Sequence, residues 1–211
     1  MKKGIFCIVF SILMMSISPQ LKAQFNLGGG LVFNRYSNGD FKKVYSGLQM
    51  RIGYDLPKKR LFFSAGYNIT PTKWKSTTYL TDDPESYETL VIKMNNAFFH
   101  YGVRLFEPEG NFHVRLFGGA SMDFINCSWE VGENVSASEK KTLTDTTMQG
   151  PKVDLGISLD FKFGNGMFFG EYVLGLPANK VNDQPFDNPT IFHRGMIIGY
   201  SYIFESKKTR W

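Results

Sequence analysis

The chain has 211 residues, of which 43% are apolar and 20% are charged, and its formal net charge is +5. This balance excludes a disordered chain, which has few apolar residues, and a fibre, which has a repetitive composition. Beyond residue 23 no apolar run approaches the roughly eighteen residues that a spanning helix needs. The mature chain is therefore not a helical membrane protein.

The first 23 residues have the three parts of a secretory signal peptide. Lys2 and Lys3 are positively charged, residues 4–17 are apolar, and Ala23 offers a small side chain at the cut. We expect export and cleavage after Ala23, which leaves 188 residues and a net charge of +2. Cys127 is then the single cysteine, so no disulfide can form within the chain, and we assign this thiol no role.

Eight segments beyond residue 23 alternate between apolar and polar residues with the period of a β-strand, and no helical stretch of useful length competes with them. They cover 100 of the 188 mature residues, far above the usual strand content of about a quarter, which predicts an all-β protein. In chain order the segments are 24–35, 45–54, 61–70, 90–106, 112–126, 152–163, 167–175 and 190–204.

The connections between these segments alternate between short and long. They contain 9, 6, 19, 5, 25, 3 and 14 residues, and the short ones hold turn residues, as in Gly164, Asn165 and Gly166. An even number of meandering strands with short turns at one end and long loops at the other is typical of an outer-membrane barrel. We therefore predict an all-β, eight-stranded antiparallel up-and-down transmembrane β-barrel, with the long loops 71–89 and 127–151 extracellular and both termini periplasmic.

The two faces of the predicted strands differ in composition. One face is apolar and carries aromatic residues mostly at the short-turn end, as expected of an interfacial girdle, whereas the other is rich in glycine, which suits a narrow, crowded lumen. A soluble lipocalin-like carrier would show the same alternation with the apolar face inside, and this inverted arrangement stays as an alternative. The girdle residues are Phe25, Tyr54, Phe63, Phe112, Phe163, Phe168, Tyr202 and Phe204.

Ionisable residues on the lumen side balance in charge, which predicts a plug of salt bridges and disfavours a small-solute channel. The turn at residues 164–166 would place Asp160 opposite Glu171, where two carboxylates could share a proton, but we favour a structural role for the cluster. The predicted lumen charges are Arg51, Arg104, Arg115 and Lys162 with Asp123, Asp154, Asp160 and Glu171.

Three histidines, His100, His113 and His193, have the parity of the lumen face. An outer-membrane lipid-modifying enzyme would use such a histidine with a serine or aspartate, and this function stays as an alternative. We favour ordinary interior histidines and predict no enzyme. No cofactor is expected, because the glycine runs lack the lysine of a phosphate loop and no cluster has metal-ligand spacing.

The long loops carry a net charge of −4 in all, which argues against a nucleic-acid partner. Aromatic residues within them are candidates for surface contacts with a protein partner. Arg194 lies on the lipid-facing parity near the outer rim, where it could contact lipopolysaccharide. The candidate contact residues are Trp74, Tyr79, Tyr87 and Trp129.

The mature chain resembles the small Gram-negative outer-membrane β-barrel domain family that includes PorT-like proteins. The resemblance rests on Ala23 followed by Gln24, the glycine-rich stretch 26–31, and the last strand 195–204, which ends in Phe204. It implies recognition of the last strand by the barrel assembly machinery, and it would allow an accessory role in a secretion system. The seven-residue tail at 205–211, which we expect to be periplasmic, departs from the pattern of the family. The family shares no catalytic residues. We therefore expect a non-enzymatic protein of the outer membrane with a structural, surface-interaction or envelope-assembly role.

Overall fold

The computed structural model describes residues 24–38, 41–56, 60–71, 73–105, 110–140, 143, 145–178 and 192–205. The predicted signal peptide 1–23 and residues 206–211 of the predicted tail lie outside the described residues. Most of the predicted loop at 176–189 does so as well.

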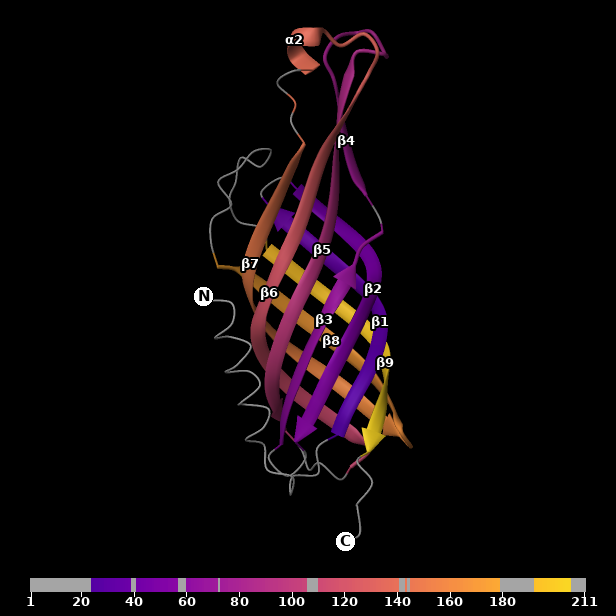
Figure 1. Cartoon of the computed structure of the whole chain (residues 1–211), viewed down its shortest axis with the longest axis vertical. Helices are drawn as coiled ribbons and strands as arrows, with labels where there is room; N and C mark the ends of the chain where they lie inside the picture. The colour runs from indigo at the N-terminus through magenta and orange to yellow at the C-terminus, as the bar shows by residue number, and fades with distance from the viewer. Residues whose placement is uncertain are drawn as a thin grey trace, which may run out of the picture.

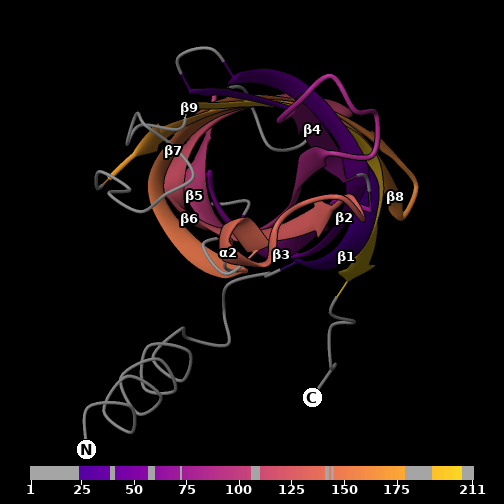
Figure 2. The same cartoon turned by 90° about the horizontal axis from the view of Figure 1, so that it is seen from above.

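The described residues form one antiparallel sheet of nine strands in the order β3-β2-β1-β9-β8-β7-β6-β5-β4. Because β3 also pairs with β5, the sheet closes on itself, and Figure 2 shows the resulting ring from above. The strands are β1 (Gln24–Asn38), β2 (Phe41–Leu56), β3 (Leu61–Ile69), β4 (Trp74–Tyr79), β5 (Tyr87–Arg104), β6 (Phe112–Val131), β7 (Thr146–Phe163), β8 (Gly166–Pro177) and β9 (Phe192–Glu205).

β3 and β4 share one position in the barrel wall, so the predicted closed barrel of eight strands is confirmed. β3 pairs with the lower half of β5 and β4 with its upper half. The break between them falls at Pro71, which has no N–H to donate to a ladder. The backbone N–H of Thr70 donates instead to the side-chain Oδ1 of Asn95 on β5, at 3.1 Å.

The prediction of two long loops at 71–89 and 127–151 was wrong. β4, the start of β5 and the end of β6 continue the wall well beyond the barrel, and the four-residue helix α2 (Ala137–Lys140) lies at the top (Figure 1). β7 likewise begins at Thr146 and not at residue 152. We call the paired segments 74–79, 87–92 and 127–131 the extension, and the opposite end of the barrel, where the chain makes its short turns, the turn end.

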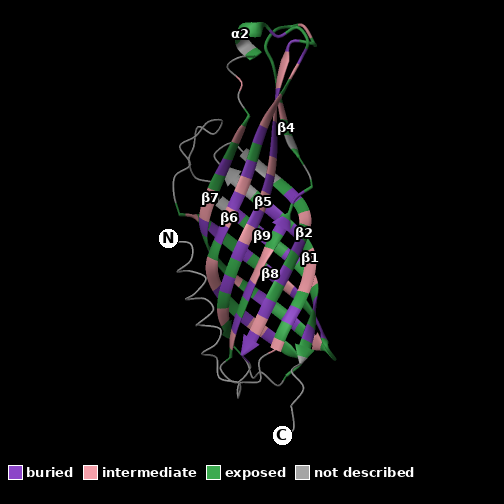
Figure 3. Ribbon diagram, in the orientation of Figure 1, coloured by how far each residue is buried: buried purple, intermediate pink, exposed green. Residues whose placement is uncertain are grey.

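The apolar rows face outward and the polar rows face the lumen. Leu31 and Met50 are 54% and 64% exposed, whereas Arg115 and Asp160 are 1% and 2% exposed. Exposed and buried residues alternate along the strands in Figure 3. The inverted arrangement of a lipocalin-like carrier is therefore wrong, because a soluble barrel would bury its apolar rows.

The middle of the lumen is filled by aromatic rings that lie over glycines of neighbouring strands. A Cβ built at each of these glycines would lie within 2.6 Å of a ring carbon, so no larger residue fits without displacing the ring. This explains three of the glycines on the lumen face, but the rings themselves were missed in the sequence, because they interrupt its alternation. The pairs are Phe98 on Gly66, Phe117 on Gly156, and Phe169 on Gly199.

Candidate functional site in the lumen and the extension

Asp55 is the centre of the ion network near the turn end. Its Oδ2 lies 3.0 Å from Nη2 of Arg104, and its Oδ1 lies 3.4 Å from Nη1 of Arg115. Nδ2 of Asn26 also donates to this carboxylate, at 3.3 Å. Arg115 bonds through Nε to Asp160 as well, so two carboxylates and two guanidinium groups from four strands are joined. Because all of these charges are buried, each needs its partner to offset the cost of leaving water.

Arg51 and Glu171 form a second buried ion pair, which crosses the lumen from β2 to β8. The guanidinium of Arg51 also lies over the ring of Phe169, 4.3 Å from its centroid. Arg115 is placed in the same way over Phe62, at 4.7 Å. Ion pairing and ring contact together fix both arginines across the barrel, which suits a plug.

The predicted juxtaposition of Asp160 with Glu171 was wrong. Asp160 pairs in register with Phe169, and Glu171 pairs with Ser158, so the two carboxylates are offset by two residues. The turn also has two residues, Gly164 and Asn165, where three were expected, so Phe163 pairs directly with Gly166. Gly164 has a φ of 56°, which a type II′ hairpin turn requires at its first position. Each carboxylate bonds to its own arginine, and no shared proton is needed.

A second polar layer lies closer to the extension. Nζ of Lys152 lies 2.6 Å from Oδ2 of Asp123, and Nδ2 of Asn96 donates to Oδ1 of the same carboxylate at 2.9 Å. Asn68 donates in turn to Asn96, at 3.2 Å. These side chains come from four neighbouring wall strands, so they form a hydrogen-bonded belt on the lumen wall.

The three histidines are buried, as their parity predicts. Nε2 of His100 lies 3.0 Å from Oδ2 of Asp154, and its ring stacks between Phe98 and Phe117 with centroid distances of 4.7 and 4.8 Å. His193 shares a hydrogen bond of 2.8 Å with Asn34. Within the described residues, His100 makes no hydrogen bond to a serine or threonine hydroxyl.

Seven of the eight predicted lumen charges are buried in the lumen, and Lys162 is partly buried near the turn end. Sequence reasoning missed Asp55 and Lys152, which are 1% and 3% exposed. Both form ion pairs with predicted lumen residues. Asp55 lies one residue beyond the predicted strand 45–54, and Lys152 lies at the start of another. Continuing the alternation by one residue would have placed Asp55 in the lumen.

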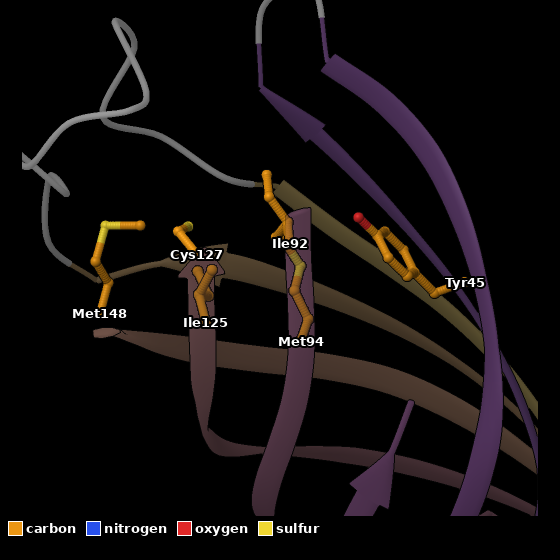
Figure 4. Packing of buried hydrophobic residues seen from close by; sticks show 6 residues of the cluster. All are labelled: Tyr45, Ile92, Met94, Ile125, Cys127 and Met148. Atoms are coloured by element: carbon orange, nitrogen blue, oxygen red, sulfur yellow. The ribbon is translucent and has the colours of Figure 1, made fainter. Parts of the chain in front are cut away.

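An apolar layer lies in the lumen above the polar belt. Its side chains come from β2, β5, β6 and β7, all are at most 4% exposed, and Leu90 packs against them. Figure 4 shows them pointing inward from the wall, with the thiol of Cys127 among them. This cluster, which we call the apolar cap, comprises Tyr45, Ile92, Met94, Ile125, Cys127 and Met148.

All four predicted contact residues lie in the extension, in strands and not in loops. Tyr79 is 65% exposed, and its ring meets that of Tyr87 edge to face at 6.5 Å. Trp129 is partly buried on β6, and the side chain of Trp74 lies outside the described residues. The extension therefore presents aromatic and polar side chains on a paired sheet.

Hydrogen bonds tie the tip of the extension together. Oδ1 of Asp83 accepts from the backbone N–H of Glu85 at 2.9 Å, and Oδ2 accepts from Nδ2 of Asn134 at 2.7 Å. These two donors, the backbone N–H first, lower the pKa of the Asp83 carboxyl. The contact with Asn134 joins the turn between β4 and β5 to the segment that follows β6.

Among the residues that the structure describes, no three His, Cys, Asp or Glu side chains are placed to hold a metal ion. In the described part of the chain, no helix has the length and hydropathy needed to cross a membrane.

Solved structures with a similar fold are small outer-membrane barrels. The chain has the fold of this class. A major outer membrane protein from Thermus thermophilus superposes with a TM-score of 0.59 at 12% identity, over 86% of this chain and 99% of that one. Ail, the attachment invasion locus protein of Yersinia pestis, gives 0.53 at 12% identity, over 87% and 100%. Neisserial surface protein A gives 0.51 at 13% identity, over 85% and 97%.

No family model and no curated protein matches the sequence. The likeness to solved structures therefore carries the fold alone, and the resemblance to PorT-like proteins stays a prediction.

Proposed function

We propose that this chain is an outer-membrane protein with a filled lumen and a non-enzymatic role in contacts at the cell surface, which the extension makes. The observation that carries the proposal is the extension itself. It is a sheet continuous with the barrel wall, it exposes aromatic and hydroxyl side chains, and it needs no lumen opening to act. A protein that only filled the membrane would have no use for a paired wall above it.

The outer face of the barrel supports a place in the outer membrane. On β1 the outward residues run from Phe25 to Phe33, and at about 3.3 Å per residue and a tilt of about 40° they make an apolar band about 20 Å high. The rings of Phe25 and Phe204 lie together at the turn end with centroids 5.9 Å apart and planes inclined by 41°, as interfacial aromatics could. The turn end then faces the periplasm, and β9 is the strand offered to the barrel assembly machinery.

Two exposed arginines mark the other border of this band. Arg35 and Arg194 are direct cross-strand partners on the outer face, immediately above Phe33 and Met196. Like charges opposite each other are unfavourable unless an anion lies between them. The phosphate groups of lipopolysaccharide would supply that anion at the outer rim.

The geometry disfavours the alternatives of an enzyme and a channel. His100 is stacked between two rings beneath the apolar cap, so a lipid substrate would have to displace packed side chains to reach it. The ion network of Asp55 fills the lumen at the turn end in the same way. An accessory role in an envelope assembly, which the PorT-like resemblance implies, would use the extension as its contact surface.

The chemistry of the extension also limits the kind of partner. The solved structure of Ail contains a heparin analogue, sucrose octasulfate, which is a polyanion. Here the tip, residues 80–88, carries Asp82, Asp83, Glu85 and Glu88 and no lysine or arginine. A polyanion would be repelled by this tip, so we favour a polypeptide partner.

An epitope inserted at the tip tests the orientation, and a trimmed barrel tests the role. Antibody should label intact cells when the epitope follows Glu133, and only permeabilised cells when it follows Asn165. Cells that carry a barrel without the extension should adhere less to protein-coated surfaces than cells that carry the whole chain. Equal adherence with equal surface levels would contradict the role, and reversed labelling would contradict the orientation.

A further inference from the structure

We propose that the free edge of β4 binds an extended segment of a partner protein, which adds to the extension as an antiparallel strand. This inference rests on the proposed function and names how the contact is made. Strand addition uses backbone hydrogen bonds for affinity and side chains of alternate residues for selectivity.

β4 pairs with β5 on one side, and in the part of the chain that the structure describes no segment pairs with its other side. The N–H of Leu80 donates to the carbonyl of Ser86 at 2.9 Å, which marks these two as a hydrogen-bonded pair. Since such pairs alternate along an antiparallel ladder, Ser76 and Thr78 bond to β5. The N–H and C=O groups of Lys75, Thr77 and Tyr79 therefore point to the free edge.

The opposite edge of the extension is treated differently. Beyond Cys127, β6 no longer pairs with β7, so its outward groups would also be free. There the backbone N–H of Trp129 donates to Oδ1 of Asp145, at 3.1 Å. Gly132 bonds to Tyr87 of β5, so residues of β6 an even number away from Gly132 also bond to β5. Trp129 is three residues away, and its N–H therefore points outward. One edge is thus capped by a side chain of the chain itself, and the other is not.

The usual devices that keep a strand edge from pairing are also lacking on β4. Edges are commonly blocked by a bulge, by proline, or by a lysine whose charge lies over the edge. The pairing of β4 with β5 runs without a bulge from Trp74 to Tyr79, and it contains no proline. Its lysine, Lys75, reaches across β5 to Glu130, with Nζ and Oε2 at 2.6 Å. The ammonium is therefore held away from the edge and its charge is compensated.

The charges that flank β4 decide which segment fits. Lys73 precedes the strand, whereas Asp82 and Asp83 follow it, and the middle is Ser76, Thr77 and Thr78 without charge. An antiparallel strand places its N-terminal end beside the acidic tip. The partner segment should therefore begin with lysine or arginine and continue with uncharged β-forming residues such as valine and threonine.

Amide hydrogen exchange on the folded barrel in nanodiscs tests this directly. The probe is a synthetic peptide of alternating threonine and valine with arginines at its N-terminal end, and the control has the same composition with the arginines at its C-terminal end. The first peptide should slow exchange at the amides of Lys75, Thr77 and Tyr79 and leave Ser76 and Thr78 unchanged. The control peptide should bind more weakly.

Three variants separate the edge from the rest of the extension. Thr77→Pro removes an outward N–H and keeps the ladder to β5, so peptide affinity should fall about tenfold, whereas Thr77→Val should leave it unchanged. Glu130→Gln leaves the β4 backbone untouched but frees the ammonium of Lys75 to lie over the edge. This variant should also weaken peptide binding. Equal binding by all four proteins, no protection by either peptide, or self-association of the barrel through β4 would overturn the proposal.

The same variants distinguish this inference from the proposed function. If cells with Thr77→Pro adhere as the whole chain does while cells with the trimmed barrel do not, the extension makes the contact without strand addition. If both adhere normally, the proposed function itself is wrong.

Discussion

At the scale of single residues, the packing of the lumen can be tested at Gly156. A Cβ at this position would overlap Cζ of Phe117 and lie 2.6 Å from the carbonyl oxygen of Tyr172. Gly156→Ala should therefore lower the free energy of unfolding by about 1–3 kcal/mol, measured by urea unfolding of the detergent-folded barrel. Adding Phe117→Leu should restore part of the loss, because the ring is only one of the two contacts.

Gly170 provides the matched control on the outer face of the same barrel. Nothing lies within 4 Å of a Cβ built there. Gly170→Ala should leave stability unchanged or raise it by about 0.5–1 kcal/mol, since alanine loses less freedom on folding than glycine. If both substitutions had the same effect, ring packing would not be what requires glycine in the lumen.

At the scale of elements, acid should loosen the tip of the extension. The N–H of Glu85 and the side chain of Asn134 hold the pKa of Asp83 below its ordinary value. A lowered pKa in the folded tip contributes stability above the ordinary value of about 4, and this contribution is lost as pH falls below it. The protection factor of the Glu85 amide, which compares its exchange with the intrinsic rate at the same pH, should therefore fall over that window, as NMR can measure. Asp83→Asn should remove this pH dependence, and an unchanged profile would show that the carboxylate does not order the tip.

The strands of the barrel could be predicted from sequence because lipid on one side and a narrow lumen on the other impose a strict alternation. The extension could not be predicted, because β4 faces neither lipid nor the narrow lumen. The run from Trp74 to Tyr79 therefore has no apolar period. The lumen charges followed from parity within the predicted strands, except for Lys152 at the start of one of them. The pairing of these charges did not follow from parity. The turn at Gly164 and Asn165 has two residues where three were expected, and this shifts the register between β7 and β8.

At the scale of the whole molecule, the barrel should not conduct. The buried ion network of Asp55 lies in the lumen at the turn end, and the buried side chains of the apolar cap lie nearer the extension, so we expect both to block passage. In planar bilayers the protein should give no ohmic steps, and Arg104→Ala alone should give none, because Arg115 still contacts Asp55. Steps that grow on replacing Arg104 or Arg115 would show that the lumen is a gated path and not a plug.

The continuity of β5 and β6 through both barrel and extension has a mechanical consequence. These strands, of 18 and 20 residues, run from the turn end to the extension without a break. A pull on a partner bound to β4 would pass through the ladder between β4 and β5 and then be directed along the length of β5 and β6. Hydrogen bonds of a ladder loaded in this direction share the force and must fail together, whereas those of a flexible loop would peel one by one. A cell tethered through this protein would be anchored by the whole barrel.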